Sequence, residues 1–290
     1  MVLSSLAFDI FKLAVYGVLV MVQNNIRQRI HLEGQKGWLM PYKHGRPVID
    51  LSIWFRLASA WGFYLTIPIA FLINFMMFST RYKNRFRLYD IKKTVTVSNH
   101  TTFFDPVKIA ALVLPGLIYQ TLLEATVEFP VLGTYTRILG GVPVPRGISG
   151  YRKILEICER AFKYRKYLHF YPEGECFLYN QQIKEFKPGA FKIAAELDIP
   201  VLPLVTVFSQ GLFRPWSFLG RSLPKETLVI LEPVYPSQYV RRDENGEFTA
   251  DSIRKFAEAV RKKMQAEIDR RGGSSAFFRG RMNRIKGLND

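Results

Sequence analysis

His100 and Asp105 are the two residues whose types and spacing point most directly to catalysis. A histidine can accept a proton near neutral pH, because its reference pKa is about 6.5. A carboxylate bonded to one ring nitrogen fixes the tautomer and leaves the other nitrogen available as a general base. On spacing alone, the alternative is an ordinary loop histidine followed by an aspartate that caps a helix at Pro106.

Three later segments also contain residues suited to chemistry. Residues 140–147 (GGVPVPRG) combine glycines, which allow close backbone approach, with Arg146, which can hold a phosphate or carboxylate through a bidentate fork. Residues 171–176 (YPEGEC) place the Glu173 carboxylate between a proline and a glycine. Taken singly, both segments could equally be turns with solvated side chains. Residues 199–204 (IPVLPL) are mostly structural, since prolines shape the entry of a strand.

The elements around His100 would position it at the edge of a sheet. Residues 93–98 alternate valine with threonine, which predicts a β-strand. Residues 106–113 predict a helix, and Pro106 suits its first turn. In α/β proteins, functional groups gather at the carboxyl ends of strands, which is where His100 would lie.

Further along the chain, strand patterns alternate with helix patterns. Strands are expected at residues 116–121, 167–171, 201–208 and 227–231, and helices at residues 151–165, 189–197 and 251–271. This alternation predicts an α/β fold with a mixed, largely parallel sheet flanked by helices. We assign this domain to residues 93–271.

The N-terminal region has a different character. Residues 57–80 contain no charged side chain, and a helix of that length would span about 36 Å, enough to cross a hydrocarbon core. Basic residues flank both ends, which favours a re-entrant or interfacial arrangement, with Pro68 producing a kink or a broken hairpin. Residues 6–22 could form a second inserted or amphipathic piece. We therefore predict membrane-embedded or interfacial helices over residues 1–92; a buried soluble helix is the alternative.

The charge balance points to an anionic partner. The net charge is +17, with 41 Lys and Arg against 24 Asp and Glu. Nucleic acid and an anionic membrane leaflet are the usual partners of such a surface. No nucleic-acid-binding motif accompanies the charge, and the uncharged run would be unexpected there, so we expect membrane lipids and no nucleic acid. Residues 272–290 form a basic C-terminal tail, either frayed or a basic-aromatic membrane anchor.

No metal site or disulfide is expected. Cys158 and Cys176 have neither zinc-binding spacing nor a Cys-x-x-Cys arrangement, and both should be small buried side chains. The other histidines show no ligand spacing with His100. His169 lies on a predicted strand and should pack in the core.

In this order, the segments resemble the motifs of the glycerolipid acyltransferase family, which includes the 1-acylglycerol-3-phosphate acyltransferases. The family pattern is Asn-His-x₄-Asp, a glycine-rich stretch ending in arginine, Phe-Pro-Glu-Gly, and an apolar strand containing prolines. The resemblance covers about residues 90–235. The matching positions are His100 and Asp105; Gly140 and Arg146; Pro172, Glu173 and Gly174; Pro200 and Pro203; and Lys187, within a Lys-x-Gly segment.

The resemblance implies an acyltransferase that moves a fatty acyl group from acyl-CoA or acyl carrier protein, as co-substrate, to a lysophospholipid hydroxyl. The foremost acceptor is 1-acylglycerol 3-phosphate, giving phosphatidic acid; another lysolipid or glycerol 3-phosphate is the alternative. A non-catalytic lipid-binding protein of the membrane surface is the alternative of another class. The enzyme would need no further cofactor and would be membrane-associated with its site on the cytoplasmic side. Its oligomeric state is open.

Within that implied mechanism, His100 is the general base and Asp105 its partner. The substrate-binding residues would be Gly140, Arg146, Glu173, Gly174 and Lys187, with backbone N–H groups near Gly174 forming an oxyanion hole. One departure concerns the acceptor. The family usually has threonine and then arginine or serine after Pro-Glu-Gly, where this chain has Glu175 and Cys176. Lys184, Lys187 or Arg137 could supply the missing cation.

Overall fold

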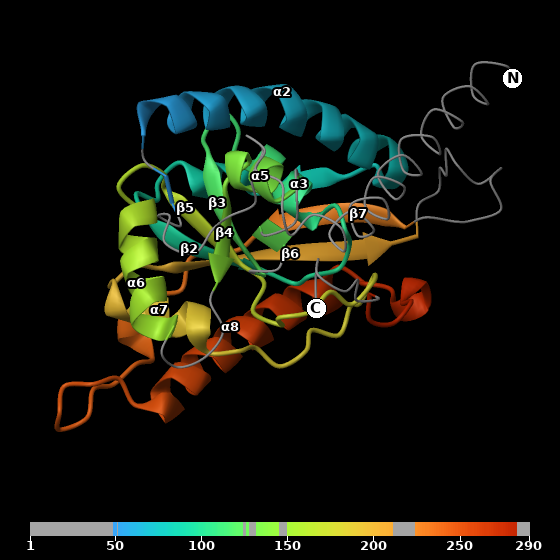
Figure 1. The fold of residues 1–290 in the computed structure, drawn as a ribbon. Helices are drawn as coiled ribbons and strands as arrows, with labels where there is room; N and C mark the ends of the chain where they lie inside the picture. The colour runs from blue at the N-terminus through green and yellow to red at the C-terminus, as the bar shows by residue number, and fades with distance from the viewer. Residues whose placement is uncertain are drawn as a thin grey trace, which may run out of the picture.

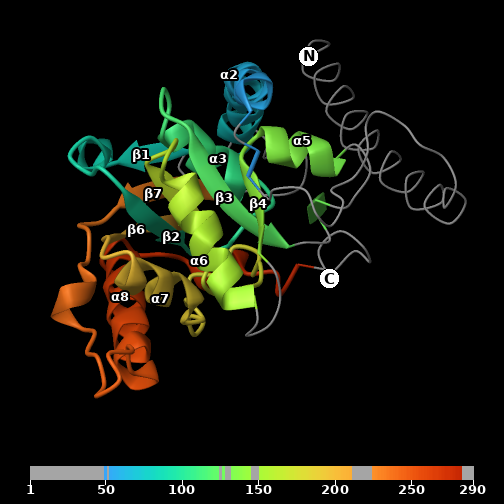
Figure 2. The same cartoon turned by 60° about the vertical axis from the view of Figure 1, so that its left-hand side comes forward.

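The computed structural model describes residues 49–50, 52–123, 126–127, 132–144, 150–210 and 224–282. These residues form three layers, a central sheet between two groups of helices (Figures 1 and 2). The inserted piece predicted at residues 6–22, and Arg146, lie outside the described residues.

The described residues contain a seven-stranded sheet in the order β1-β7-β6-β2-β5-β3-β4. All neighbouring strands are parallel except β6 and β7, which are antiparallel. This confirms the predicted mixed, largely parallel sheet. The strands are β1 (Arg81–Lys83), β2 (Thr94–Ser98), β3 (Ile118–Leu123), β4 (Gly141–Val144), β5 (Tyr167–Phe170), β6 (Val201–Ser209) and β7 (Lys225–Ile230).

Helices cover both faces of the sheet, as Figure 2 shows. One face carries α2 (Ile53–Phe78), α3 (Asp105–Leu112) and α5 (Leu132–Ile138); the other carries α6 (Gly150–Ala161), α7 (Gly189–Glu196) and α8 (Ala250–Arg270). Short 3₁₀ segments are η1 (Arg85–Leu88), η3 (Pro236–Gln238) and η4 (Ser275–Phe277). The two sides form separate hydrophobic clusters, because successive strand side chains point to opposite faces.

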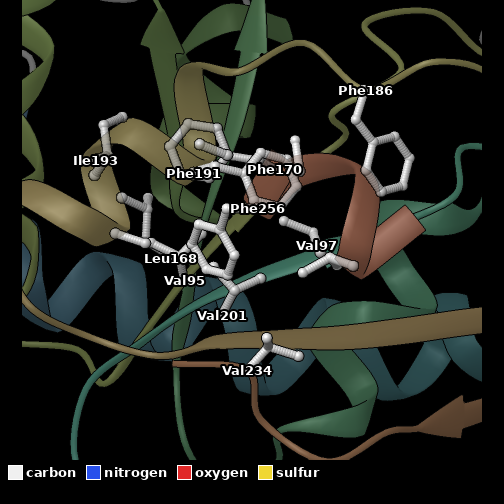
Figure 3. Packing of buried hydrophobic residues seen from close by; sticks show 14 of the residues in the cluster. Val95, Val97, Leu168, Phe170, Phe186, Phe191, Ile193, Val201, Val234 and Phe256 are labelled. Atoms are coloured by element: carbon white, nitrogen blue, oxygen red, sulfur yellow. The ribbon is translucent and has the colours of Figure 1, made fainter. Parts of the chain in front are cut away.

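The larger cluster lies between the sheet and helices α7 and α8. Strand residues such as Val95, Leu168 and Val201 meet Phe191 of α7 and Phe256 of α8 (Figure 3). The alternate residues of β2 and β5, which include Thr96 and His169, face the α3 side. The polar side chains of β2 and β5 that lead to the site therefore lie on the α3 face, which also carries the smaller of the two hydrophobic clusters.

Helix α2 runs along the domain next to α3 and α5 (Figure 1). It begins at Ser52, whose hydroxyl accepts a hydrogen bond from the Phe55 N–H, and it continues through Pro68, so the predicted broken hairpin is wrong. Its inner face buries Ser59, Phe63, Ile67, Asn74 and Phe78. Its outer face exposes large apolar side chains, namely Trp54, Trp61, Leu65, Ile69 and Leu72. Within the described ranges, α2 is the one helix long and apolar enough to cross a membrane.

The sheet extends beyond the boundary predicted at residues 92 and 93. Strand β1 lies upstream of that boundary and pairs with β7, so the sheet already includes Arg81–Lys83. Strand β1 and strand β4 were not predicted. Both are short and lie at the edges of the sheet, where Pro143 is tolerated because an edge strand can forgo one N–H.

The first part of the predicted C-terminal tail is docked on the domain. The Leu178 N–H donates to the Gly280 carbonyl at 2.9 Å, and the Met282 N–H donates to the Cys176 carbonyl at 2.9 Å. Phe277 of η4 is buried. The frayed-tail alternative is therefore wrong for residues 274–282, which lie against the segment that follows Glu173 and Gly174.

Candidate active site

His100 and Asp105 meet in the turn between β2 and α3. Strand β2 ends at Ser98 and helix α3 begins at Asp105, so both residues lie beyond the carboxyl end of a central strand. The His100 Nδ1 lies 2.7 Å from the Asp105 Oδ2. Because an ionised carboxylate only accepts hydrogen bonds, Nδ1 carries the proton and Nε2 carries the lone pair. The contact predicted from the spacing is confirmed.

The Asp105 carboxylate is fully buried and densely bonded. It accepts hydrogen bonds from the backbone N–H groups of Thr101 and Thr102 and from the Thr102 hydroxyl, and it pairs with the Lys108 ammonium. Burial by itself raises the pKa of Asp105, but the Lys108 charge and the hydrogen bond from His100 outweigh it and hold that pKa well below its usual range. Asp105 is therefore a fixed anion beside the imidazole.

The segment after β5 holds His100 at its backbone and at its ring. The His100 N–H donates to the Glu173 Oε1 at 3.0 Å, and the Phe177 N–H donates to the His100 carbonyl at 2.9 Å. The His100 ring stacks on Tyr171 with 4.0 Å between centroids. The other Glu173 oxygen, Oε2, accepts from the Lys184 N–H at 3.1 Å. Glu173 is thus a buried clamp on backbone groups, and its predicted part in substrate binding stays a prediction.

Replacing Glu173 with glutamine should lower the free energy of unfolding by about 1–3 kcal/mol, because the amide NH₂ cannot accept from one of the two buried N–H donors. The loss should depend on pH. Burial raises the pKa of Glu173 to about 7 from 4.5, against the opposing effect of the two backbone N–H bonds. A carboxyl with a raised folded-state pKa stabilises the fold at low pH, and this contribution is lost as pH rises through about 7.

Urea unfolding of both proteins at about pH 5 and about pH 8 measures this effect. The margin of the wild type over Glu173→Gln should be larger at the lower pH. If the difference in unfolding free energy between the two proteins grows with pH, the two N–H bonds stabilise the ionised Glu173 carboxylate more than burial destabilises it.

Gly174 and Lys187 also lie in this clamp. Gly174 has φ +73°, and its N–H donates to the Tyr171 carbonyl at 2.9 Å, so this N–H is engaged in a turn. The oxyanion hole predicted from N–H groups near Gly174 stays a prediction. A Cβ on Gly174 would lie 2.5 Å from the Lys187 Nζ. The glycine therefore makes room for the Lys187 ammonium beside the loop that holds His100.

Gly140 does not reach the site. It precedes β4, whose first residue, Gly141, pairs with Gln120 at the level of Thr96 in the middle of β2. Its φ of +95° and its close approach to Arg165 explain the glycine as a turn residue. Gly140 therefore lies away from His100, and its predicted substrate contact stays a prediction, as does that of Arg146, which is outside the described residues.

Arg281 lies next to Cys176, the position where the family pattern has arginine or serine. Cys176 is buried there, but Arg281 of the docked C-terminal segment lies 3.0 Å from the Glu175 carboxylate. Arg281 could not be predicted from the sequence, because its pairing with Glu175 joins positions more than 100 residues apart. Lys108 was not predicted either, although a lysine three residues after an aspartate on a helix lies on the same helix face.

The remaining histidine and cysteine predictions agree with the structure. His169 is fully buried, with its ring nitrogens 2.9 Å from the Thr96 hydroxyl and 3.1 Å from the Ser98 hydroxyl. Burial, aided by the nearby His100, lowers the pKa of His169 to about 3. Cys158 and Cys176 are buried and free. In the part of the chain that the structure describes, no group of three or more His, Cys, Asp or Glu side chains could hold a metal ion.

The residues of this site lie within a segment that is similar to a known protein family. A model of the acyltransferase family matches residues 79–207, which include His100, Asp105, Glu173, Gly174 and Lys187. The chain contains an acyltransferase domain. The match covers less than half of the chain and agrees with the resemblance to glycerolipid acyltransferases that the motifs carry.

Two curated relatives share about half of this chain. A chloroplastic 1-acyl-sn-glycerol-3-phosphate acyltransferase, BAT2 from Brassica napus, is 31% identical over 147 residues, which are 50% of this chain and 41% of the relative. The human lysophospholipid acyltransferase LPCAT4 is 29% identical over 160 residues, 53% of this chain and 29% of the relative. The chain thus spans less than half the length of these relatives.

A solved structure is also similar to this chain. The 1-acyl-sn-glycerophosphate acyltransferase PlsC from Thermotoga maritima has a TM-score of 0.48 and 21% identity, covering 74% of this chain and 79% of that one.

Proposed function

We propose that this protein transfers a fatty acyl group from acyl-CoA or acyl carrier protein to the hydroxyl of a lysophospholipid. The foremost acceptor is 1-acylglycerol 3-phosphate, and the product is phosphatidic acid. The observation that carries the proposal is the 2.7 Å contact between His100 Nδ1 and a buried, ionised Asp105 within the acyltransferase domain. The names of the relatives support a lysophospholipid acceptor.

In the proposed reaction, His100 Nε2 removes the proton from the acceptor hydroxyl as its oxygen attacks the thioester carbonyl. Asp105 stabilises the imidazolium that forms. The tetrahedral intermediate then collapses, the carbon–sulfur bond breaks, and the departing thiolate takes the proton from Nε2. Acyl ester and thiol are the products, and the side chains return to their starting states.

We further propose that the protein works at a membrane surface, with its site on the cytoplasmic side. The outer face of α2 exposes Trp54 and Trp61 at 78% and 76%, and the chain leaves this helix into the exposed basic residues Arg81 and Lys83. Apolar and aromatic groups enter the headgroup region, while basic side chains bind anionic lipids and mark the cytoplasmic side. Lipid acceptors would then reach His100 from the bilayer.

The test is an acyl-transfer assay with purified protein in vesicles of phosphatidylcholine and phosphatidylglycerol. Labelled acyl-CoA and acyl carrier protein are compared as donors, and lysophosphatidate, lysophosphatidylcholine and glycerol 3-phosphate as acceptors. We expect the fastest transfer to lysophosphatidate. Faster transfer to another acceptor would change the assigned substrate. Tight vesicle binding without transfer to any acceptor would show a lipid-binding protein and overturn the proposal.

Lys187→Ala should raise the KM for a phosphate-bearing acceptor about 10-fold, as expected for one charge-assisted hydrogen bond of about 1.5 kcal/mol, with little change in kcat. The reason is that its ammonium lies over Gly174, beside the loop that holds His100. Lys255→Ala is the matched control, because this lysine is exposed on α8 in the layer across the sheet from α3. An unchanged KM in Lys187→Ala would remove Lys187 from acceptor binding.

A further inference from the structure

A second buried ion pair lies directly behind the candidate dyad. The Lys108 Nζ is 2.7 Å from the Asp105 Oδ1, the oxygen turned away from His100 Nδ1, and it also forms an ion pair with the Glu226 carboxylate of β7. The side chains of Lys108 and Glu226 are 1% and 0% exposed. The four groups thus form a continuous series from His100 to Glu226.

Helix α2 fixes the far end of this series. The Thr80 hydroxyl donates to the Glu226 Oε2 at 2.7 Å, and the Asn74 side-chain NH₂ donates to the Thr80 hydroxyl at 2.8 Å. Asn74 and Thr80 are buried as well. Glu226 is therefore held in place from two sides and has little freedom to leave Lys108.

Burying a lysine and a glutamate in a core costs free energy. Removing two charges from water costs several kcal/mol per ion, and apolar residues of similar volume often serve as well. Burial by itself lowers the pKa of Lys108, but the charges of Asp105 and Glu226 outweigh it and raise that pKa above its usual value. The lysine is therefore a cation within hydrogen-bond distance of the carboxylate that faces His100.

The charges of these groups have a consequence for catalysis. With a neutral imidazole, Asp105 and Glu226 are anions and Lys108 is a cation, so the cluster has a net charge of −1. Without the Glu226 charge, Lys108 would cancel Asp105, and the cluster would be neutral. An imidazolium forms more readily beside a net anion than beside a neutral cluster.

We propose that Lys108 and Glu226 are a positioning pair for the dyad. Lys108 fixes the orientation of Asp105 through Oδ1, and Glu226 neutralises Lys108, so that the full charge of Asp105 supports the imidazolium. The proposal rests on the proposed role of His100 as the base and concerns residues that touch no substrate.

Other ionisable groups surround the series, and every variant in the test keeps them. Around Asp105, Lys108 and Glu226 they are His169, Tyr171, Glu173, Cys176, Tyr179 and Tyr82.

The test compares Glu226→Gln, Lys108→Met and the double variant. Glutamine keeps the size of Glu226 and an oxygen for Thr80 but removes the charge. We expect Glu226→Gln to lower kcat about 10–100-fold, the range typical for outer partners of a reactive group, with the acceptor KM unchanged. The acidic limb of its pH–rate profile should move to lower pH. In the double variant the net charge of −1 returns, so kcat and the acidic limb should move back toward the wild type.

If Lys108 and Glu226 only stabilised the fold, the losses in kcat of the single variants would add. The double variant would then have the lowest kcat. That result, or wild-type kcat and pH profile in Glu226→Gln, would overturn the proposal.

Nitrogen NMR of histidine-labelled protein gives a readout that needs no substrate, with the His100 signal assigned by its absence in His100→Ala. The signal should titrate at lower pH in Glu226→Gln and return in the double variant. If the signal responds in this way but no acyl transfer occurs, the proposed function fails and the electrostatic coupling stands; if transfer occurs and the signal does not respond, the coupling fails alone.

Discussion

Replacing His100 with alanine should lower the rate of acyl transfer by about 10²–10⁴-fold, the usual contribution of a general base. The dyad geometry supports this expectation, since Nδ1 is bonded to a buried anion and the side chain is 20% exposed. The fold should persist, because Asp105 keeps its pairing with Lys108 and its bonds from the Thr101 and Thr102 N–H groups. Initial rates with labelled donor measure the loss, and a circular dichroism melting curve checks the fold.

His31→Ala is a matched control, because it removes a histidine that lies outside the motif. Its rate should equal that of the wild type. Undiminished turnover in His100→Ala would reject His100 as the base, whatever the acceptor proves to be.

Phe256→Ala should lower the free energy of unfolding by about 3–5 kcal/mol, as is typical when a buried aromatic side chain leaves a cavity. Phe256 is fully buried beside Phe191 (Figure 3), and the two rings pack edge-to-face with 5.4 Å between centroids. The Phe256 ring also stacks on Tyr239, with 5.5 Å between centroids. It therefore joins α8 to α7 and to the sheet. Urea unfolding with linear extrapolation measures the change.

The matched control is Phe278→Ala, since this phenylalanine is 42% exposed and its loss should stay within about 0.5 kcal/mol. A comparable loss in both variants would show that Phe256 is not a core residue. Because α8 leads into the docked segment at residues 274–282, Phe256→Ala should also weaken the contacts of that segment with the loop after Glu173.

The sequence by itself determined the features that depend on neighbouring residues. Strand β2 could be predicted because Val95 and Val97 alternate with threonines, which matches the two faces of a half-apolar sheet. The pairing of His100 with Asp105 could be predicted because both lie in one turn between a strand and a helix. His169 could be assigned to the core because it stands within a short strand pattern. The family followed from the order of the motifs, each of which is weak when taken singly.

Only the tertiary structure decided the features that join distant segments. Glu173 binds the backbone of His100, and Glu226 pairs with Lys108, across separations of 73 and 118 residues. Such pairings depend on how strands and loops meet in space, and no local pattern encodes that. The same reason explains the position of Gly140: it stands in a motif, but it precedes β4 at the edge of the sheet, separated from β2 by two strands and away from His100. Local periodicity thus predicts elements and their neighbours, whereas the distances between elements, and so the site's charge balance, come from the packed fold.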